Sequence, residues 1–212
     1  MHIPDGFLNI VTVAATTTVS AGGVANAVRV ASKKLGEKQV PLMGVMAAFI
    51  FAAQMLNFPI AGGTSGHFMG AALAAILLGP WAGVLILTCV LVAQCFIFQD
   101  GGLLALGANI LNMGIIGSFS SYYLYRLLNS LLGNGRNSKL IGGFAGAWVS
   151  LVLESIACAL ELTLSGISPI AMVLPAMAGV HALIGIVEGL VTVAVLSVVM
   201  ATRVDLLEMQ KM

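Results

Sequence analysis

The chain has 212 residues, of which 59% are hydrophobic and only 8% are charged, and its formal net charge is +1. Ordinary soluble domains carry about 25% charged residues. This composition, with a mean hydropathy of +1.06, excludes a soluble globular protein and predicts an all-α polytopic integral membrane protein surrounded by lipid. The nine basic residues are too few and too scattered for a surface that follows phosphates, so no nucleic-acid partner is expected.

The first predicted element is a metal-binding segment at residues 1–9, which begins Met1-His2-Ile3-Pro4-Asp5. The free α-amine of Met1, the backbone nitrogen of His2 and Nδ1 of the His2 ring can bind one metal ion through two fused chelate rings. Three nitrogens then occupy three corners of a square, which suits Ni(II) or Cu(II) better than tetrahedral Zn(II). A histidine at position 2 can also occur by chance, so these two residues alone do not decide the matter.

We expect Met1 to be retained, because His2 is too bulky for the usual removal of the initiator methionine. A cleavable signal peptide is not expected either, because no basic segment precedes the first apolar run.

Uncharged runs separated by polar turns predict seven membrane spans within one transmembrane domain, residues 1–212. About 20 apolar residues suffice for a helix to cross the hydrocarbon core. The predicted spans are residues 10–28, 41–58, 68–79, 80–98, 103–125, 140–164 and 175–202. Residues 68–98 could instead form a single bent unit, which would reduce the count to six.

Residues 59–67, with the sequence PIAGGTSGH, are predicted to form a loop between the second and third spans. Pro59 and three glycines disfavour a helix here. Gly79-Pro80 interrupts the apolar run that follows, so the helix at 68–79 is too short to cross the whole core. Its start would lie within the membrane, and the loop would fold inward over protein, where irregular backbone is tolerated.

The basic residues predict the orientation of the chain. All nine Lys and Arg fall in residues 29–40, 126–139 and 203–212, and none falls in residues 57–67, 99–102 and 162–170. Cytoplasmic loops carry the excess of basic residues. The N-terminus is therefore predicted outside the cell and the C-terminus in the cytoplasm, with the protein in the plasma (inner) membrane.

This orientation places His67 on the same outer side as the N-terminus, where it can supply a fourth nitrogen. The predicted ligands are the Met1 amine, the His2 amide and ring, and the His67 ring. Ni(II) is the predicted substrate, with Co(II) or Cu(II) as alternatives, although Cu(II) should bind this plane more tightly. Considered alone, His67 would be a capped loop or surface histidine. His181 and Glu188 share one face of the last span and could serve transport or only structure.

Polar residues near the outer ends of the spans are candidates to brace the ligands, because a ligating imidazole usually donates its other N–H to an acceptor. They are Gln54, Asn57, Thr64, Ser65, Gln94, Gln99, Asp100, Asn109 and Asn112. Each could instead make only helix–helix hydrogen bonds. Small residues recur every four positions on the second span, at Gly44, Ala48 and Ala52, and would let a helix approach closely, whether from a partner or from the chain itself.

Five stretches resemble the NikM/CbiM family. They are MHIPDGFL at 1–8, VPLMGVMAAFIFAAQMLNFPIAGGTSGH at 40–67, LLGPWAG at 77–83, FQDGGLLALGANILNMG at 98–114 and HALIGIVEGL at 181–190. MHIPDGF with AGGTSGH is similar to the nickel branch, whereas the cobalt branch reads nearer MHIMEG. The resemblance implies the substrate-capture (S) component of an energy-coupling-factor (ECF) transporter for nickel or cobalt. It also implies a six-helix core with an extra N-terminal helix, and nickel bound by Met1, His2 and His67.

The chain contains no Walker A motif and no metalloprotease or serine-hydrolase pattern, so we expect a transport subunit without its own enzymatic activity. The resemblance implies a transmembrane coupling (T) subunit and two cytosolic ATPase subunits as partners, and it allows for small accessory membrane subunits. It also implies that the stripe on the second span faces the coupling subunit. The alternatives are a channel or carrier that works alone and an intramembrane zinc metalloenzyme.

Overall fold

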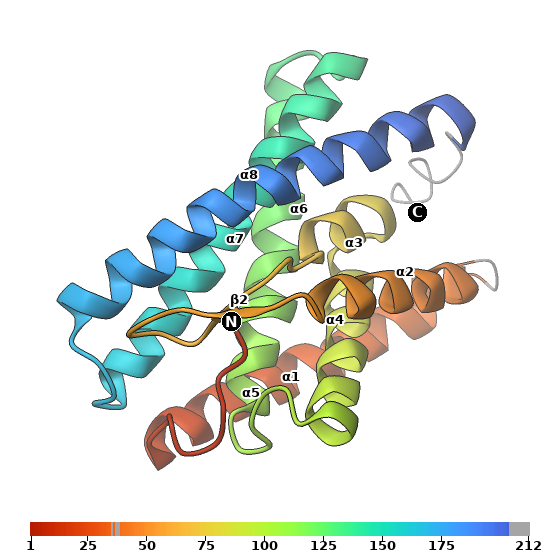
Figure 1. The fold of residues 1–212 in the computed structure, drawn as a ribbon. Helices are drawn as coiled ribbons and strands as arrows, with labels where there is room; N and C mark the ends of the chain where they lie inside the picture. The colour runs from red at the N-terminus through yellow and green to blue at the C-terminus, as the bar shows by residue number, and fades with distance from the viewer. Residues whose placement is uncertain (35, 37–38, 204–212) are drawn as a thin grey trace.

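A computed structural model describes residues 1–34, 36 and 39–203. The helices are α1 (Ile10–Lys34), α2 (Gln39–Gln54), α3 (Ala71–Leu78), α4 (Pro80–Ala93), α5 (Leu106–Asn109), α6 (Gly117–Leu131), α7 (Arg136–Leu164) and α8 (Ile170–Thr202). The π-helical turn η1 (Gln94–Phe98) continues α4, and η2 (Ile110–Ile116) joins α5 to α6. Two short antiparallel strands, β1 (Phe58–Pro59) and β2 (Ser65–Gly66), form a hairpin before α3 (Figure 1).

The chain is a mostly helical, multi-pass membrane protein. Within the described residues, four helical segments are long and apolar enough to cross a membrane. They are Ile10–Lys33, Pro80–Phe98, Arg136–Leu164 and Ile170–Thr202. The apolar helix α2 is shorter, with 16 residues, and α3 has only eight.

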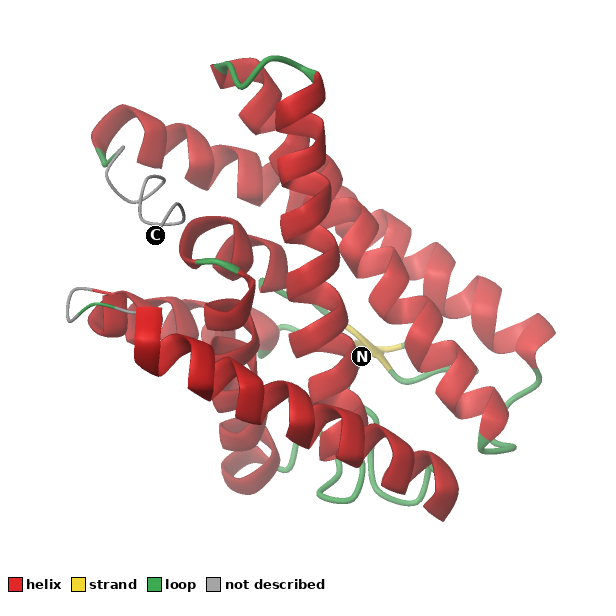
Figure 2. Ribbon diagram, turned by 180° about the vertical axis from the view of Figure 1, so that it is seen from behind, coloured by secondary structure: helices red, strands yellow, loops and turns green. Residues whose placement is uncertain are grey.

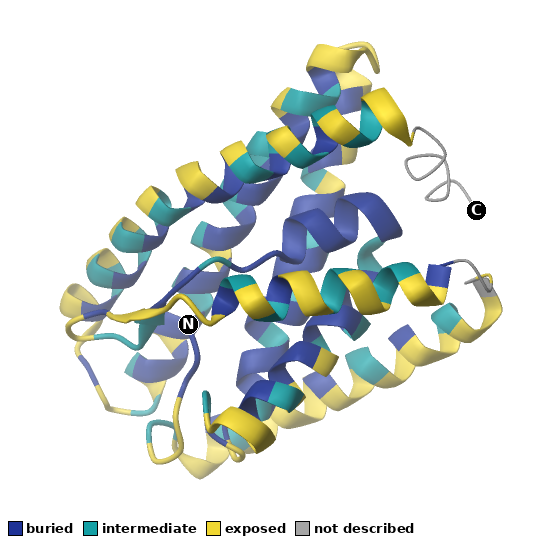
Figure 3. Ribbon diagram, turned by 45° about the vertical axis from the view of Figure 1, so that its right-hand side comes forward, coloured by how far each residue is buried: buried dark blue, intermediate teal, exposed yellow. Residues whose placement is uncertain are grey.

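Helix α3 lies at the centre of the molecule, and all of its residues are buried (Figure 3). It contacts α2, α4, α6 and α7. Glycines set both of its ends, since Gly70 has a φ of 78° and Gly79 a φ of 90°, a region that favours glycine. A Cβ atom at Gly70 would also collide with Ile50. The short helix that the sequence predicts therefore exists, but it begins at Ala71 rather than at residue 68.

Segments that are far apart in the sequence meet at one end of the helix bundle. Asn9 Nδ2 donates to the Leu164 carbonyl at 2.9 Å, and Asn57 Nδ2 donates to Asp100 Oδ2 at 3.0 Å. The N-terminal segment, the hairpin, the turn after η1 and the turn before α8 therefore share this end. The C-terminal ends of α1 and α8 lie at the opposite end (Figure 1).

Two other predicted spans differ from the observed helices. The last helix begins at Ile170 rather than at residue 175, and Pro175 lies inside it, where the missing proline N–H removes one hydrogen bond close to the helix start. The sequence predicts one span over residues 103–125, whereas the helical run there begins at Leu106, ends at Leu131 and contains the π-helical turn η2 between α5 and α6. Such π-helical turns are rare, are frequent at functional sites and leave no periodic pattern in the sequence.

Candidate metal-binding site

The N-terminal segment runs back from the start of α1 into the molecule and ends beside the hairpin (Figures 1 and 2). Met1 is only 1% exposed and Ile3 is fully buried. The Asn109 side chain bonds both main-chain groups of Ile3, at 2.9 Å to its nitrogen and 3.1 Å to its oxygen. The Asp5 carboxylate accepts hydrogen bonds from the Leu103 and Leu104 amides at 3.0 and 2.7 Å. These contacts hold the segment in a defined position.

The end of this segment brings Met1 and His2 to His67. The Met1 amine nitrogen lies 2.7 Å from His67 Nε2 and 2.6 Å from the Ser65 carbonyl oxygen. The His2 amide donates to Ser65 Oγ at 3.2 Å. The His2 and His67 rings stack, with centroids 4.5 Å apart and planes at 24°. The structure thus gathers the nitrogens of the three predicted ligand residues in one place.

The tautomer of His67 follows from its neighbours. Nδ1 of His67 lies 2.8 Å from the carbonyl oxygen of Phe68. A carbonyl can only accept, so Nδ1 carries the proton and Nε2 keeps a lone pair. That lone pair is directed at the Met1 amine.

A relay of two glutamines fixes the tautomer of His2. Gln54 Nε2 donates to the Met69 carbonyl at 2.7 Å, so the Gln54 oxygen is free to accept from Gln94 Nε2 at 3.0 Å. The Gln94 oxygen in turn lies 2.9 Å from His2 Nε2. Because the relay starts at a carbonyl, each amide can be oriented in only one way, and His2 Nε2 must carry the proton. His2 Nδ1, the atom that could close a chelate ring with the backbone, keeps its lone pair.

His2 Nδ1 is buried and has no hydrogen-bond partner among the described residues. Leaving a buried polar atom unpaired is costly. The Asp100 carboxylate lies close to this nitrogen, with its Oδ1 3.4 Å away. A cation at this position would satisfy the nitrogen, and the Asp100 carboxylate would partly balance its charge.

Burial changes the acid–base properties of all three groups. It lowers the pKa of the Met1 amine from 8.0 to about 5. Burial, with a further contribution from the nearby amine, lowers the pKa of His2 to about 3 and that of His67 well below its usual value. The three groups are therefore neutral bases at pH 7, which is the form that binds a metal ion. Burial also raises the pKa of Asp100.

The candidate site at the N-terminus needs main-chain nitrogens as well as side chains. The described part of the chain contains no group of three or more His, Cys, Asp or Glu side chains that could hold a metal ion. Two of the four nitrogens at the N-terminal site belong to the main chain, so the signal in the sequence is the position of His2 directly after Met1.

The other predicted bracing residues divide into two groups. Gln54, Ser65, Gln94, Asp100 and Asn109 touch the ligand residues, the N-terminal segment or the glutamine relay, and Asn57 holds Asp100. The remaining three lie elsewhere. Thr64 Oγ1 is 3.8 Å from Cys158 Sγ, Asn112 donates to Glu161, and Gln99 is exposed and makes no side-chain hydrogen bond within the described residues.

The sequence analysis assigns no role to Asp5, although this residue lies in the MHIPDGFL stretch at 1–8.

His181 and Glu188 are both buried on α8, but they make no hydrogen bond to each other among the described residues. His181 Nδ1 donates to the Met177 carbonyl, whereas Glu188 accepts from the Met69 and Gly70 amides.

The small-residue stripe of α2 faces outward. Gly44, Ala48 and Ala52 are all exposed, and a Cβ atom at Gly44 would meet nothing within 4 Å. The described helices of the chain therefore do not cover it.

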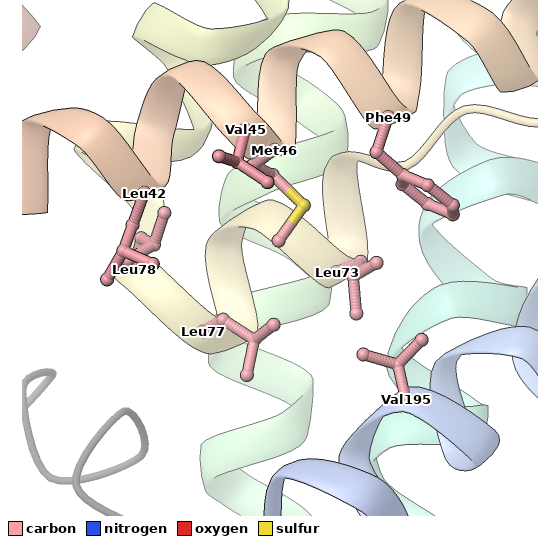
Figure 4. Close-up of a pocket in the computed structure, with 8 residues that line it drawn as sticks. All are labelled: Leu42, Val45, Met46, Phe49, Leu73, Leu77, Leu78 and Val195. Carbon is pink, nitrogen blue, oxygen red and sulfur yellow. The ribbon is translucent and has the colours of Figure 1, made fainter. Parts of the chain in front are cut away.

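A separate apolar cleft of about 260 Å³ lies between α2, α3 and α8 (Figure 4). No polar side chain lines it, so it offers no ligand to a metal. Its lining residues are Leu42, Val45, Met46, Phe49, Leu73, Leu77, Leu78 and Val195.

Comparisons with known proteins agree on the class of this chain. A family model described as the cobalt uptake substrate-specific transmembrane region, CbiM, matches residues 2–206. A putative fused nickel transport protein, NikMN, of Archaeoglobus fulgidus is 42% identical over 98% of this chain and 68% of its own length. The cobalt transport protein CbiM of Sorangium cellulosum is 30% identical over 98% of this chain and 95% of its own length.

A solved structure described as a truncated transition metal transporter superimposes with a TM-score of 0.88 at 37% identity, covering 95% of this chain and 99% of that one. The chain therefore belongs to the NikM/CbiM family of membrane proteins that take part in nickel or cobalt transport.

Proposed function

We propose that this chain is the substrate-capture subunit of an ATP-driven ECF-type nickel uptake transporter. In this proposal Ni(II) binds to four nitrogens in a square plane: the Met1 amine, the His2 amide, His2 Nδ1 and His67 Nε2. The observation that carries it is the placement of the Met1 amine 2.7 Å from His67 Nε2. Beside it lies His2 Nδ1, which is buried and has no hydrogen-bond partner within the described part of the chain.

The chemistry of these donors supports nickel. Neutral nitrogens and a deprotonated amide in a plane suit Ni(II) and Cu(II), whereas structural zinc prefers a tetrahedron. Both imidazoles already present a lone pair, and the amine is neutral at pH 7. Only the His2 amide has to lose a proton when the metal enters.

Cobalt is the second candidate substrate, because the family includes proteins named for cobalt transport. The Archaeoglobus fulgidus relative, which is 42% identical, is instead named for nickel transport. Cu(II) would bind the same plane more tightly than Ni(II). Selection of nickel would then depend on metal supply and on the steps that follow capture.

We place the site on the outer side of the plasma membrane. The described loops at the metal-site end contain no Lys or Arg, whereas Arg29, Arg126, Arg136 and Arg203 lie near helix ends away from it. The positive-inside rule then puts the C-terminus in the cytoplasm.

The partners in this proposal are a transmembrane coupling subunit and two cytosolic ATPases, and the proposal allows for small accessory membrane subunits. The exposed stripe of Gly44, Ala48 and Ala52 on α2 is the surface we assign to the coupling subunit, since small residues let helices pack closely in lipid. After capture, the 60–67 loop closes over nickel, and reorientation of the subunit by its partners exposes the site to the cytoplasm.

Metal analysis and a visible spectrum of the purified protein test the proposal directly. Square-planar Ni(II) with an amide ligand is yellow and diamagnetic, and we expect one nickel ion per chain. A colourless zinc-loaded protein would support a metalloenzyme and contradict the proposal. Nickel uptake by vesicles that lack the ATPases would instead support a channel or carrier that works alone.

A further inference from the structure

A buried carboxyl group on α8 holds the chain just after His67. Glu188 Oε2 accepts a hydrogen bond from the Met69 amide at 2.8 Å, and Glu188 Oε1 accepts one from the Gly70 amide at 2.9 Å. Glu188 lies 119 residues from Met69 in the sequence, and it is 1% exposed. Both amides precede the first residue of α3, so the carboxyl group also faces the positive end of that helix.

Met69 is held on its other side as well. Its carbonyl accepts from Gln54 Nε2 at 2.7 Å, and Gln54 begins the relay through Gln94 to His2 Nε2. Met69 is therefore connected to both histidines. His67 lies two residues before it in the chain, and the glutamine relay joins the Met69 carbonyl to His2.

Resting on the proposed function, we propose that Glu188 is a positioning residue for the metal site. By fixing the Met69 and Gly70 amides, it sets where the His67 imidazole lies and where the glutamine relay to His2 starts. Both hydrogen bonds form away from water, where such bonds are stronger than at the surface. Within the described residues, Glu188 makes no hydrogen bond to Met1, His2 or His67, so it acts through the Met69 and Gly70 backbone.

The matched control is Glu154 on α7. It is also a fully buried glutamate, but neither of its oxygens has a hydrogen-bond partner among the described residues. Glu188→Gln and Glu154→Gln make the same replacement of a buried carboxyl group by an amide of nearly the same shape. Only Glu188→Gln replaces an acceptor by an NH₂ group that faces one of the two backbone amides.

We expect Glu188→Gln to raise the Kd for nickel about 10–100-fold, the range seen when groups that orient metal ligands are removed. Glu154→Gln should change the Kd much less, because Glu154 accepts no hydrogen bond from the chain around His67 within the described residues. The visible band of the nickel complex should shift in Glu188→Gln at saturating nickel, because the His67 nitrogen no longer sits in the plane. A loss of stability alone would not move that band. Equal effects of the two glutamine variants, or an unshifted band, would overturn the inference.

A double-variant cycle separates this inference from the proposed function. If Glu188 acts partly through His67, then Glu188→Gln should weaken binding less in a His67→Ala background than in the native protein. If the increase in Kd of the double variant equals the product of the increases in the two single variants, the inference is contradicted. If His67→Ala alone leaves nickel binding intact, the proposed function fails instead. Should Glu188→Gln not accumulate in the membrane, Glu188→Asp, which keeps the carboxyl group but shortens the side chain, should show an intermediate Kd and band shift. Native values in that variant would count against the inference.

Discussion

The amine nitrogen of Met1 lies 2.7 Å from Nε2 of His67, although 66 residues separate them in the sequence. Each partner is anchored independently. Asn109 and Gly102 hold the N-terminal segment at Ile3, whereas the hairpin and Glu188 hold the chain on either side of His67. The site therefore forms only where the N-terminal segment meets the chain around His67. Because the two segments have separate supports, a substitution can displace one of them and leave the other in place.

Replacement of His67 by alanine should abolish nickel uptake and weaken nickel binding more than about 100-fold, which exceeds the effect of losing a bracing group. The variant removes the fourth nitrogen and leaves the three nitrogens of Met1 and His2 with water as the remaining ligand. Equilibrium binding to the purified protein and uptake in cells measure the effect. Protein recovered from the membrane in normal amount is the control, and a native Kd in this variant would contradict the ligand assignment.

Addition of one glycine before Met1 should have an equally large effect. It converts the amine into an amide and inserts bulk at a position that is only 1% exposed. The same glycine added after residue 212 is the matched control, and it should leave uptake at the native level. Normal nickel uptake by the N-terminally extended protein would rule out the amine as a ligand.

The three proposed ligand residues could be found from the sequence because their chemistry is local. A free amine followed by histidine can chelate a metal ion wherever it lies in the fold. His67 lies in a glycine-rich loop on the predicted outer side, where the loops contain no Lys or Arg. The structure then brings these residues together, and the end of the N-terminal segment that reaches them is buried (Figure 3).

The supporting network could not be assigned in this way. The relay from Met69 through Gln54 and Gln94 to His2 joins four elements, and its direction depends on which carbonyl starts it. The sequence identified Gln54 and Gln94 as candidates but offered Gln99 and Asn112 equally. The structure places Gln94 in the relay, at the first position of the π-helical turn η1. Hydrophobic periodicity in the sequence does not predict such a turn.

Gln94→Leu should raise the Kd for nickel about 10–100-fold. Leucine keeps much of the volume but cannot accept from His2 Nε2, so the proton is free to move to Nδ1, the nitrogen that the metal needs. Gln99→Leu is the control, because Gln99 is exposed and outside the network. Isothermal titration of both variants measures the difference, and equal affinities would show that the relay does not orient His2.

Gly102→Ala should weaken nickel binding without changing any ligand. A Cβ atom at this position would collide with the backbone nitrogen and the carboxylate of Asp5. That carboxylate holds the N-terminal segment against the turn after η1. Gly22→Ala, where a Cβ atom would meet nothing within 4 Å, is the matched control. Nickel titration and protease accessibility of the N-terminus should both report release of the segment in Gly102→Ala. Native affinity in that variant would mean that the Asp5 contacts do not support the site.

Nickel binding at pH 7 should release about one proton per metal ion, whereas a flexible Met-His peptide should release about two. In the folded protein the pKa of the Met1 amine is lowered from 8.0 to about 5, so the amine loses its proton as the pH rises through about 5. At pH 7 the amine of the folded protein is already deprotonated, so metal binding releases only the proton of the His2 amide. In the peptide the amine keeps its ordinary pKa, is mostly protonated at pH 7, and must also lose a proton.

Calorimetric titrations in buffers of different ionisation enthalpy count these protons. Below pH 5 the folded protein should also release two, because its amine is then protonated before the metal arrives. Two protons released by the folded protein at pH 7 would show that the amine is not held in the buried position that we describe.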